Sequence, residues 1–109
     1  MEKRYSEFTV EELRDEVSKL KEKLLKAEQV GNISEYAIIE RKMQMALAYT
    51  LNPKDYKKEE TYELQGDPGQ TFQIDYINGV FAWGHRINLL GQKYDKQEAL
   101  PISVLGNKK

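Results

Sequence analysis

The apolar residues of this chain change their spacing at Pro53, and this change constrains the fold more than any other feature of the sequence. Before Pro53 they recur every three or four residues, which is the period of a helix buried along one side. After it they alternate with polar residues over short runs separated by turn residues, as half-buried strands do. We therefore predict an α+β chain, with a helical hairpin over residues 1–53 and a small β-barrel over residues 54–109.

The first helix is predicted from residue 9 to residue 30. Six apolar side chains share one stripe of it: Val10, Leu13, Val17, Leu20, Leu24 and Ala27. Thr9 and Glu12 form a capping box, in which each side chain accepts a hydrogen bond from the backbone N–H of the other residue. Gly31 and Asn32 both tolerate left-handed backbone, so we expect the helix to end there.

The second helix is predicted from about Ile33 to Thr50, with Asn32 or Ser34 as its cap. Pro53 pushes the preceding residue out of the helical region and so ends it. The short link between the helices favours an antiparallel hairpin. The near-heptad apolar spacing also leaves a homodimer of two hairpins open.

The apolar surface of the second helix is wider than one packing seam needs. We therefore expect this helix to contact both its partner helix and the barrel, so that the chain forms one cooperative unit with a shared core. The residues that it would contribute to this core are Tyr36, Ile38, Met43, Leu47 and Leu51.

The barrel is predicted from four or five short strands over about fifty residues. The segments with strand patterns are Glu60–Leu64, Thr71–Ile77, Val80–Ile87 and Ala99–Leu105. Residues 66–69 form a predicted turn, Asn78-Gly79 a predicted two-residue hairpin turn, and residues 88–97 a predicted loop. Gly84 lies inside a strand, which indicates a bulge or a sharp bend. Pro101 indicates an edge or bulge position.

A turn at Asn78-Gly79 fixes the register of the central hairpin. It pairs Ile77 with Val80 and Ile74 with Trp83. One face would then hold Phe72, Ile74, Tyr76, Phe81 and Trp83, with His85 at its edge. We interpret this face as the barrel core, with aromatic side chains near the strand ends half exposed.

The sequence offers little material for catalysis or metal binding. There is no cysteine, and His85 is the single histidine. A zinc site built from Cys and His therefore cannot be assembled within one chain, and Asp67, Asp75 and Asp95 are too scattered for a calcium loop. The register places no acidic or nucleophilic partner beside His85, so we expect a structural role for it. We predict no enzyme activity, no metal and no cofactor.

The sequence also predicts the cellular compartment of the protein. No run of about 18 apolar residues is present, so no membrane span is expected. The first residues carry no apolar segment typical of a secretory signal. Together with the absence of cysteine, this predicts a cytoplasmic protein.

Five strings of the sequence carry a resemblance to a known family. They are residues 1–6 (MEKRYS), 40–43 (ERKM), 51–56 (LNPKDY), 78–84 (NGVFAWG) and 99–105 (ALPISVL). In this order and over essentially the whole length, the chain resembles the YfhH-like family of small bacillar proteins. The resemblance implies a helical hairpin followed by an SH3-like barrel. It implies no activity and no ligand residues.

Two hypotheses of function follow. The first is a non-enzymatic regulatory module that binds a protein partner through aromatic side chains of the barrel, since Tyr and Trp are favoured anchors in interfaces. The predicted binding residues are Tyr62, Tyr76, Trp83, Arg86 and Tyr94. The alternative is a transcription- or translation-related nucleic-acid-binding protein that uses a basic patch at Lys54, Lys57 and Lys58. With 17 Lys and Arg against 18 Asp and Glu, the charge argues against this alternative.

Overall fold

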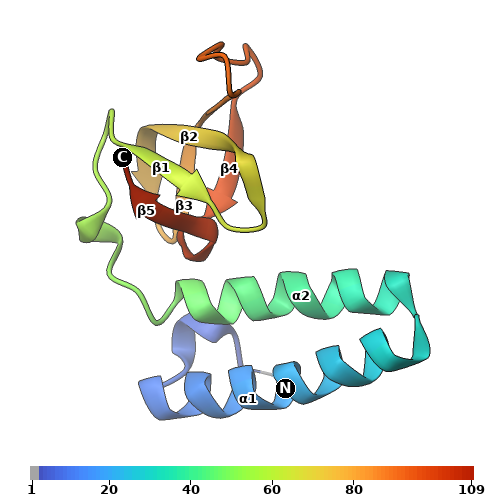
Figure 1. Ribbon diagram of the computed structural model, residues 1–109. Coiled ribbons are helices and arrows are strands. Elements are labelled where there is room, and N and C mark those ends of the chain that lie inside the picture. The colour runs from blue at the N-terminus through green and yellow to red at the C-terminus, as the bar shows by residue number, and fades with distance from the viewer. Residues whose placement is uncertain (1–2) are drawn as a thin grey trace. The chain divides into compact units, whose positions relative to one another are not determined.

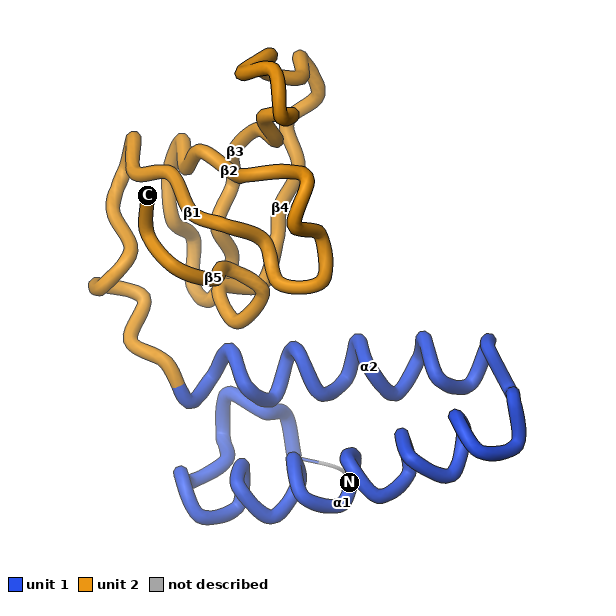
Figure 2. Tube along the Cα trace, in the orientation of Figure 1, with its two compact units in different colours: residues 1–50 blue, residues 51–109 orange. Residues whose placement is uncertain are grey.

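The computed structural model describes residues 3–109. The chain divides into two compact units, residues 1–50 and residues 51–109 (Figure 2). This boundary lies three residues before the one that the sequence predicts at Pro53. The core shared between helices and barrel stays a prediction, and each unit is described separately below.

The first unit is an antiparallel pair of helices, α1 (Val10–Val30) and α2 (Ile33–Ala48), preceded by a single 3-10 turn at Tyr5–Glu7 (Figure 1). The predicted capping box is confirmed, because Thr9 Oγ1 accepts from the Glu12 N–H at 3.1 Å and the Thr9 N–H donates to Glu12 Oε1 at 3.0 Å. Gly31 ends α1 with a φ of 73°. The α1 prediction is therefore correct to within one residue.

The α2 helix is capped by Asn32, whose Oδ1 accepts from the Glu35 N–H at 3.1 Å. It ends at Ala48, two residues earlier than predicted. The Thr50 hydroxyl donates to the Leu47 carbonyl oxygen at 2.6 Å. This bond satisfies one of the carbonyl groups that the last turn of a helix leaves without an intrahelical partner.

The core of the first unit follows the predicted stripe of α1. Its buried residues are Leu13, Val17, Leu20, Ala27, Ile39 and Ala46. Val10 is the exception, since 55% of its surface is exposed at the start of α1. Ala46 was not predicted, because alanine gives little hydrophobic signal, yet its small side chain is fully buried between larger ones.

The second unit is a five-stranded antiparallel sheet in the order β4-β3-β2-β1-β5. The strands are β1 (Thr61–Leu64), β2 (Asp67–Asn78), β3 (Phe81–Ile87), β4 (Glu98–Pro101) and β5 (Leu105–Lys108). The predicted α+β class is confirmed. Within residues 3–109, β4 and β5 lie at the two edges and do not pair with one another, so closure into an SH3-like barrel stays a prediction.

Two strand boundaries were predicted wrongly. Asp67 already pairs with Leu64, so β2 starts inside the predicted turn, and the reversal is made by Gln65 and Gly66. Gly66 takes a φ of 79°, which glycine adopts at no steric cost. The last predicted strand is interrupted by a 3-10 turn at Ile102–Val104, where the Ile102 side chain is fully buried.

The register of the central hairpin was also predicted wrongly. Asn78 pairs with Phe81, so the two turn residues are Gly79 and Val80 rather than Asn78 and Gly79. Gly79 has a φ of 61° and Val80 does not have a positive φ. Positive φ at the first turn position alone is the requirement of a type II′ turn, which spares the β-branched Val80 from a left-handed conformation.

A bulge at Asp75 then shifts the β2 side chains relative to β3. Ile74 pairs with Gly84 before the bulge, and Tyr76 pairs with Trp83 after it. A Cβ atom at Gly84 would lie only 1.9 Å from the Gln73 carbonyl oxygen, so this close approach of the strands requires glycine. The prediction of a bulge at Gly84 is thus confirmed, with the extra residue on the neighbouring strand.

The bulge overturns the predicted core face. Phe72, Ile74 and Ala82 are buried, whereas Tyr76 is 45% exposed. Successive side chains of a strand point to opposite faces. Trp83, between the buried Ala82 and Gly84, therefore shares the outward face with Tyr76.

Candidate functional site

The outward face of β2 and β3 carries a stacked aromatic pair. The Tyr76 and Trp83 ring centroids lie 5.9 Å apart with an interplanar angle of 6°. Such a pair contributes beyond the area that it buries, and each ring restricts the rotamers of the other. The two side chains are a cross-strand pair directly after the bulge, so the bulge is the local cause of the stack.

The face continues onto the edge strand β4. Trp83 pairs with Ala99 and Phe81 pairs with Pro101, so these residues lie on the same face in neighbouring strands. We call Tyr76, Phe81, Trp83, Ala99 and Pro101 the aromatic face. Tyr76 is exposed and the other four residues are half-buried. The aromatic face is therefore a continuous apolar surface on three strands, beside an unpaired strand edge.

His85 lies next to this face with both ring nitrogens engaged. Its Nε2 is 3.1 Å from Asp75 Oδ2, and its Nδ1 is 2.9 Å from the Tyr94 carbonyl oxygen. Gln97 Nε2 also donates to Asp75 Oδ2, at 2.8 Å. The expectation that no carboxylate lies beside His85 is wrong, because the bulge brings Asp75 to it. The contacts fasten the loop after β3 to the sheet, which agrees with a structural role.

Arg86 ties three strands together. Its Nε donates to Glu98 Oε2 at 2.9 Å, and its Nη1 donates to Asp67 Oδ2 at 3.2 Å and to Gln70 Oε1 at 3.0 Å. The guanidinium is thus engaged by two carboxylates and an amide of the chain itself. We place Arg86 among the groups that hold β2, β3 and β4 in position, outside the aromatic face.

Tyr62 and Tyr94 lie apart from the aromatic face. Tyr62 is only 5% exposed, and its hydroxyl donates to Glu60 Oε1 at 2.7 Å. Burial, followed by that hydrogen bond, raises the pKa of Tyr62 to about 12. Tyr94 is 40% exposed, with its hydroxyl accepting from Gln70 Nε2 at 3.0 Å. The predicted set is therefore split. Tyr76 stacks on Trp83, whereas Tyr94 lies beside Arg86, because the Tyr94 N–H donates to the Arg86 carbonyl oxygen at 2.9 Å and both side chains bond to Gln70.

The three lysines of the predicted basic patch are exposed but lie among acidic residues. The same segment carries Asp55, Glu59 and Glu60. Lys108 forms an ion pair with Glu60, and this hydrogen bond, followed by those from Tyr62 and the Lys57 N–H, lowers the pKa of Glu60 to about 2. The three lysines therefore share their segment with an equal number of carboxylates.

Within residues 3–109, no group of three His, Asp or Glu side chains is placed to hold a metal ion. In the same part of the chain, neither helix has the length and the apolar composition needed to cross a bilayer.

Comparison with known proteins places the chain in a family. Residues 3–106 match the family model described as "Protein of unknown function (DUF1811)". The chain belongs to this family. It is also 53% identical over 108 residues to "Uncharacterized protein YfhH" of Bacillus subtilis (strain 168), and the match covers 99% of each chain. The resemblance to a YfhH-like family is thereby confirmed.

Sequence reasoning named Tyr76 and Trp83 but assigned them to the wrong face. The signal that would have corrected this was Gly84, because a bulge on the neighbouring strand reverses the alternation of side chains beyond it. Ala99 was missed as the neighbour of Trp83, and Pro101 as the neighbour of Phe81, since the pairing of β4 with β3 spans a loop of ten residues, 88–97.

Proposed function

We propose that this protein is a non-enzymatic interaction module whose sheet unit binds a partner protein through the aromatic face. The observation that carries the proposal is the stacked pair of Tyr76 and Trp83 on the outward side of the sheet. The core below is filled by other residues, among them the fully buried Phe72, Ile74 and Ile102. The pair is therefore not needed to fill that core, and its apolar area is available to a partner.

The geometry of the pair suits a protein interface. Tyr and Trp give a large contact area with only two side-chain torsions each, so little conformational entropy is lost on binding. Stacking fixes these torsions before a partner arrives, which lowers the cost of ordering further. The rings also carry a hydroxyl and an indole N–H that can bond to a partner backbone.

The charge of the unit favours a protein over a nucleic acid. Residues 51–109 hold eight Lys and Arg against eight Asp and Glu. Proteins that stack bases on aromatic side chains combine them with a positively charged groove along the backbone. The aromatic face instead has an acidic residue next to it, Asp75, which precedes Tyr76 in β2 and contacts His85. Nucleic-acid binding is therefore the alternative that the experiment must also test.

The non-enzymatic part of the proposal is supported by the contacts of His85. A general acid or base must exchange a proton with its substrate directly or through one water molecule. Both ring nitrogens of His85 already face acceptors of the chain itself, the Asp75 carboxylate and the Tyr94 carbonyl oxygen. While these contacts hold, neither ring nitrogen of His85 is available to exchange a proton with a substrate.

The experiment is photo-cross-linking in cells with a benzophenone amino acid in place of Tyr76. Leu89 provides the control position, because it is 83% exposed in the loop after β3 and lies off the aromatic face. We expect one protein to be cross-linked reproducibly from position 76 and not from position 89, and to be lost when Trp83→Ala is added. The same adducts from both positions, or a nucleic-acid adduct at position 76, would count against the proposal.

A further inference from the structure

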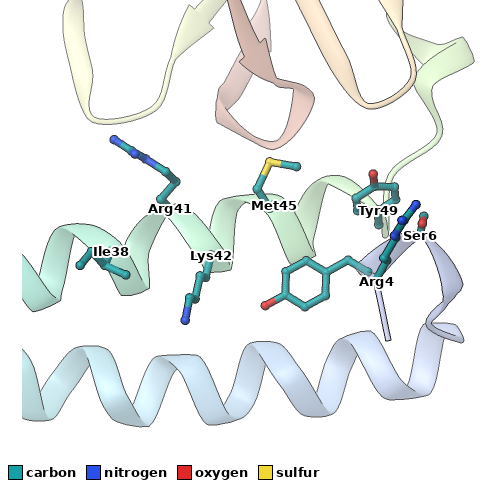
Figure 3. Close-up of a pocket in the computed structure, with 8 residues that line it drawn as sticks. Arg4, Ser6, Ile38, Arg41, Lys42, Met45 and Tyr49 are labelled. Carbon is teal, nitrogen blue, oxygen red and sulfur yellow. The ribbon is translucent and has the colours of Figure 1, made fainter. Parts of the chain in front are cut away.

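The helical unit carries a groove that the proposed function does not use. It has a volume of about 600 Å³ and lies against α2 and the segment that leads into α1 (Figure 3). The residues that line it are Arg4, Tyr5, Ser6, Ile38, Arg41, Lys42, Met45 and Tyr49. All of them belong to the first unit, so the groove is a feature of that unit alone.

Four of these residues form a second face of α2. Ile38, Arg41, Lys42 and Met45 are spaced by three, one and three positions, so they lie on one side of the helix. Tyr49 follows as the C-cap residue and packs in part against the core. The core of the unit takes Ile39 and Ala46 instead. Ile38 is 58% exposed. The helix therefore presents an apolar strip bordered by cations, apart from the strip that packs on α1.

The groove carries three cations that have no acidic partner among residues 3–109. In that part of the chain no carboxylate lines the groove, and neither Arg4, Arg41 nor Lys42 forms an ion pair. Lys3 differs in this respect, because its Nζ lies 2.9 Å from Glu12 Oε2. Residues 1–50 as a whole hold nine Lys and Arg against ten Asp and Glu. The lining of the groove therefore has an excess of positive charge that residues 1–50 as a whole do not have.

The cations stand around the groove rather than at one point. Figure 3 shows Arg41 on the side of α2 away from α1, Lys42 pointing toward α1, and Arg4 near Tyr49 at the other end. Met45 lies between Arg41 and Arg4, and Ile38 lies beyond Arg41 at the opposite end from Arg4 (Figure 3). A long ligand that alternates negative and apolar groups would reach all of these side chains.

We propose that this basic groove binds an acidic peptide segment of a partner protein, with apolar side chains of the segment on Ile38 and Met45. Carboxylates match the planar, two-pronged geometry of the Arg4 and Arg41 guanidinium groups. A long polyanion is favoured less, because the net negative charge of the unit opposes its approach beyond the groove. The groove shares no residue with the aromatic face, so a negative binding result at one site does not refute the proposal for the other.

Fluorescence anisotropy with the full chain tests this proposal. The probe is a short fluorescein-labelled peptide in which pairs of glutamates alternate with leucine and phenylalanine, and the control peptide has glutamine for every glutamate. We expect the acidic peptide to bind about tenfold more tightly than the control, and Arg41→Glu to remove about tenfold in affinity. Lys21→Glu is the matched variant, since it changes the charge equally on the exposed surface of α1 and should leave binding unchanged.

Further measurements separate the peptide-binding proposal from its alternatives. Trp83→Ala should leave the peptide affinity unchanged, which separates this proposal from the proposed function. Equal affinity for both peptides, or equal losses in Arg41→Glu and Lys21→Glu, would overturn the proposal. So would tighter binding of an oligouridine with the same sensitivity to Arg41→Glu. Light scattering that shows a dimer broken by Arg41→Glu, without peptide binding, would instead assign the groove to a second copy of the chain.

Discussion

Replacing Gly84 by alanine tests whether the bulge at Asp75 builds the aromatic face. The added Cβ would lie 1.9 Å from the Gln73 carbonyl oxygen and 3.1 Å from the Ile74 Cα. Real Cβ contacts essentially never fall below 3.0 Å. The two strands must therefore separate by about 1.1 Å, the difference between 3.0 and 1.9 Å, and the obstacle is backbone that cannot rotate away.

The cost follows from what this separation breaks. Each backbone hydrogen bond lost next to Gly84 costs about 1 kcal/mol, and forcing a methyl group into a packed site costs about 1–3 kcal/mol. With two such bonds disturbed, we expect Gly84→Ala to lower the free energy of unfolding by about 3–5 kcal/mol. A small domain has roughly 5 kcal/mol in total, so the sheet should be close to unfolding at room temperature.

Urea unfolding followed by tryptophan fluorescence measures this loss. Trp83 is the only tryptophan and lies in β3, so its emission reports on the sheet. Gly69→Ala is the matched control, because a Cβ there would meet nothing closer than 4.0 Å. We expect that variant to stay within about 1 kcal/mol of the wild type. A loss below about 1 kcal/mol in Gly84→Ala would refute the close approach of β2 and β3.

The remaining predictions concern a helix cap and the response to pH. Thr9→Ala should lower the free energy of unfolding by about 1 kcal/mol and Thr9→Ser by much less, as circular dichroism in urea would show; equal losses would contradict the capping role. Glu60 has its pKa lowered to about 2 from 4.5, so it stabilises the fold above pH 4.5 and loses this contribution as the pH falls toward 2. The stability difference between the wild type and Glu60→Gln should therefore shrink over that range, and a constant difference would be inconsistent. Tyr62 has its pKa raised from 10 to about 12, so the stability that its protonated hydroxyl gives the fold should be lost as the pH rises between those values. Tyr62→Phe lacks this hydroxyl and should therefore lose less stability than the wild type over the same alkaline range.

The helical unit could be predicted from sequence because its signals are local. Thr9 and Glu12 form the capping box three residues apart, and Gly31 stops α1 directly after its last residue. The apolar stripe identified the buried Leu13, Val17, Leu20 and Ala27 without any tertiary information. The exposure of Val10 and of Ile38, and the burial of the alanines of α2, were not predicted, since burial depends on the neighbours and not on the pattern.

The sheet was harder to predict because its faces depend on contacts between distant residues. The Asn78-Gly79 signal located the hairpin, but the turn lies one residue further on, at Gly79 and Val80. The bulge then changes the alternation again between Ile74 and Tyr76. A shift of one residue moves a whole strand's side chains to the other face. Tyr76 and Trp83 were therefore assigned to the core, and their exposure became visible only in the structure.

The candidate site was predicted in part by residue type. Tyr and Trp are common interface anchors, which singled out Tyr76 and Trp83 without predicting that they pair, and also singled out the buried Tyr62. Arg86 was chosen for its charge, yet Asp67 and Glu98 occupy its guanidinium. Exposure and partner contacts decide between such candidates, and neither can be read from composition.

The most direct test of the central claim is the affinity of the purified partner, identified by cross-linking at position 76, for the wild type and for Trp83→Ala. Isothermal titration calorimetry with folded proteins gives both values, and Leu89→Ala serves as the exposed control on the same unit. We predict a loss of at least about tenfold for Trp83→Ala, because central aromatic anchors carry about 1.4 kcal/mol or more, and no change for Leu89→Ala. Equal affinity in all three proteins would contradict binding through the aromatic face.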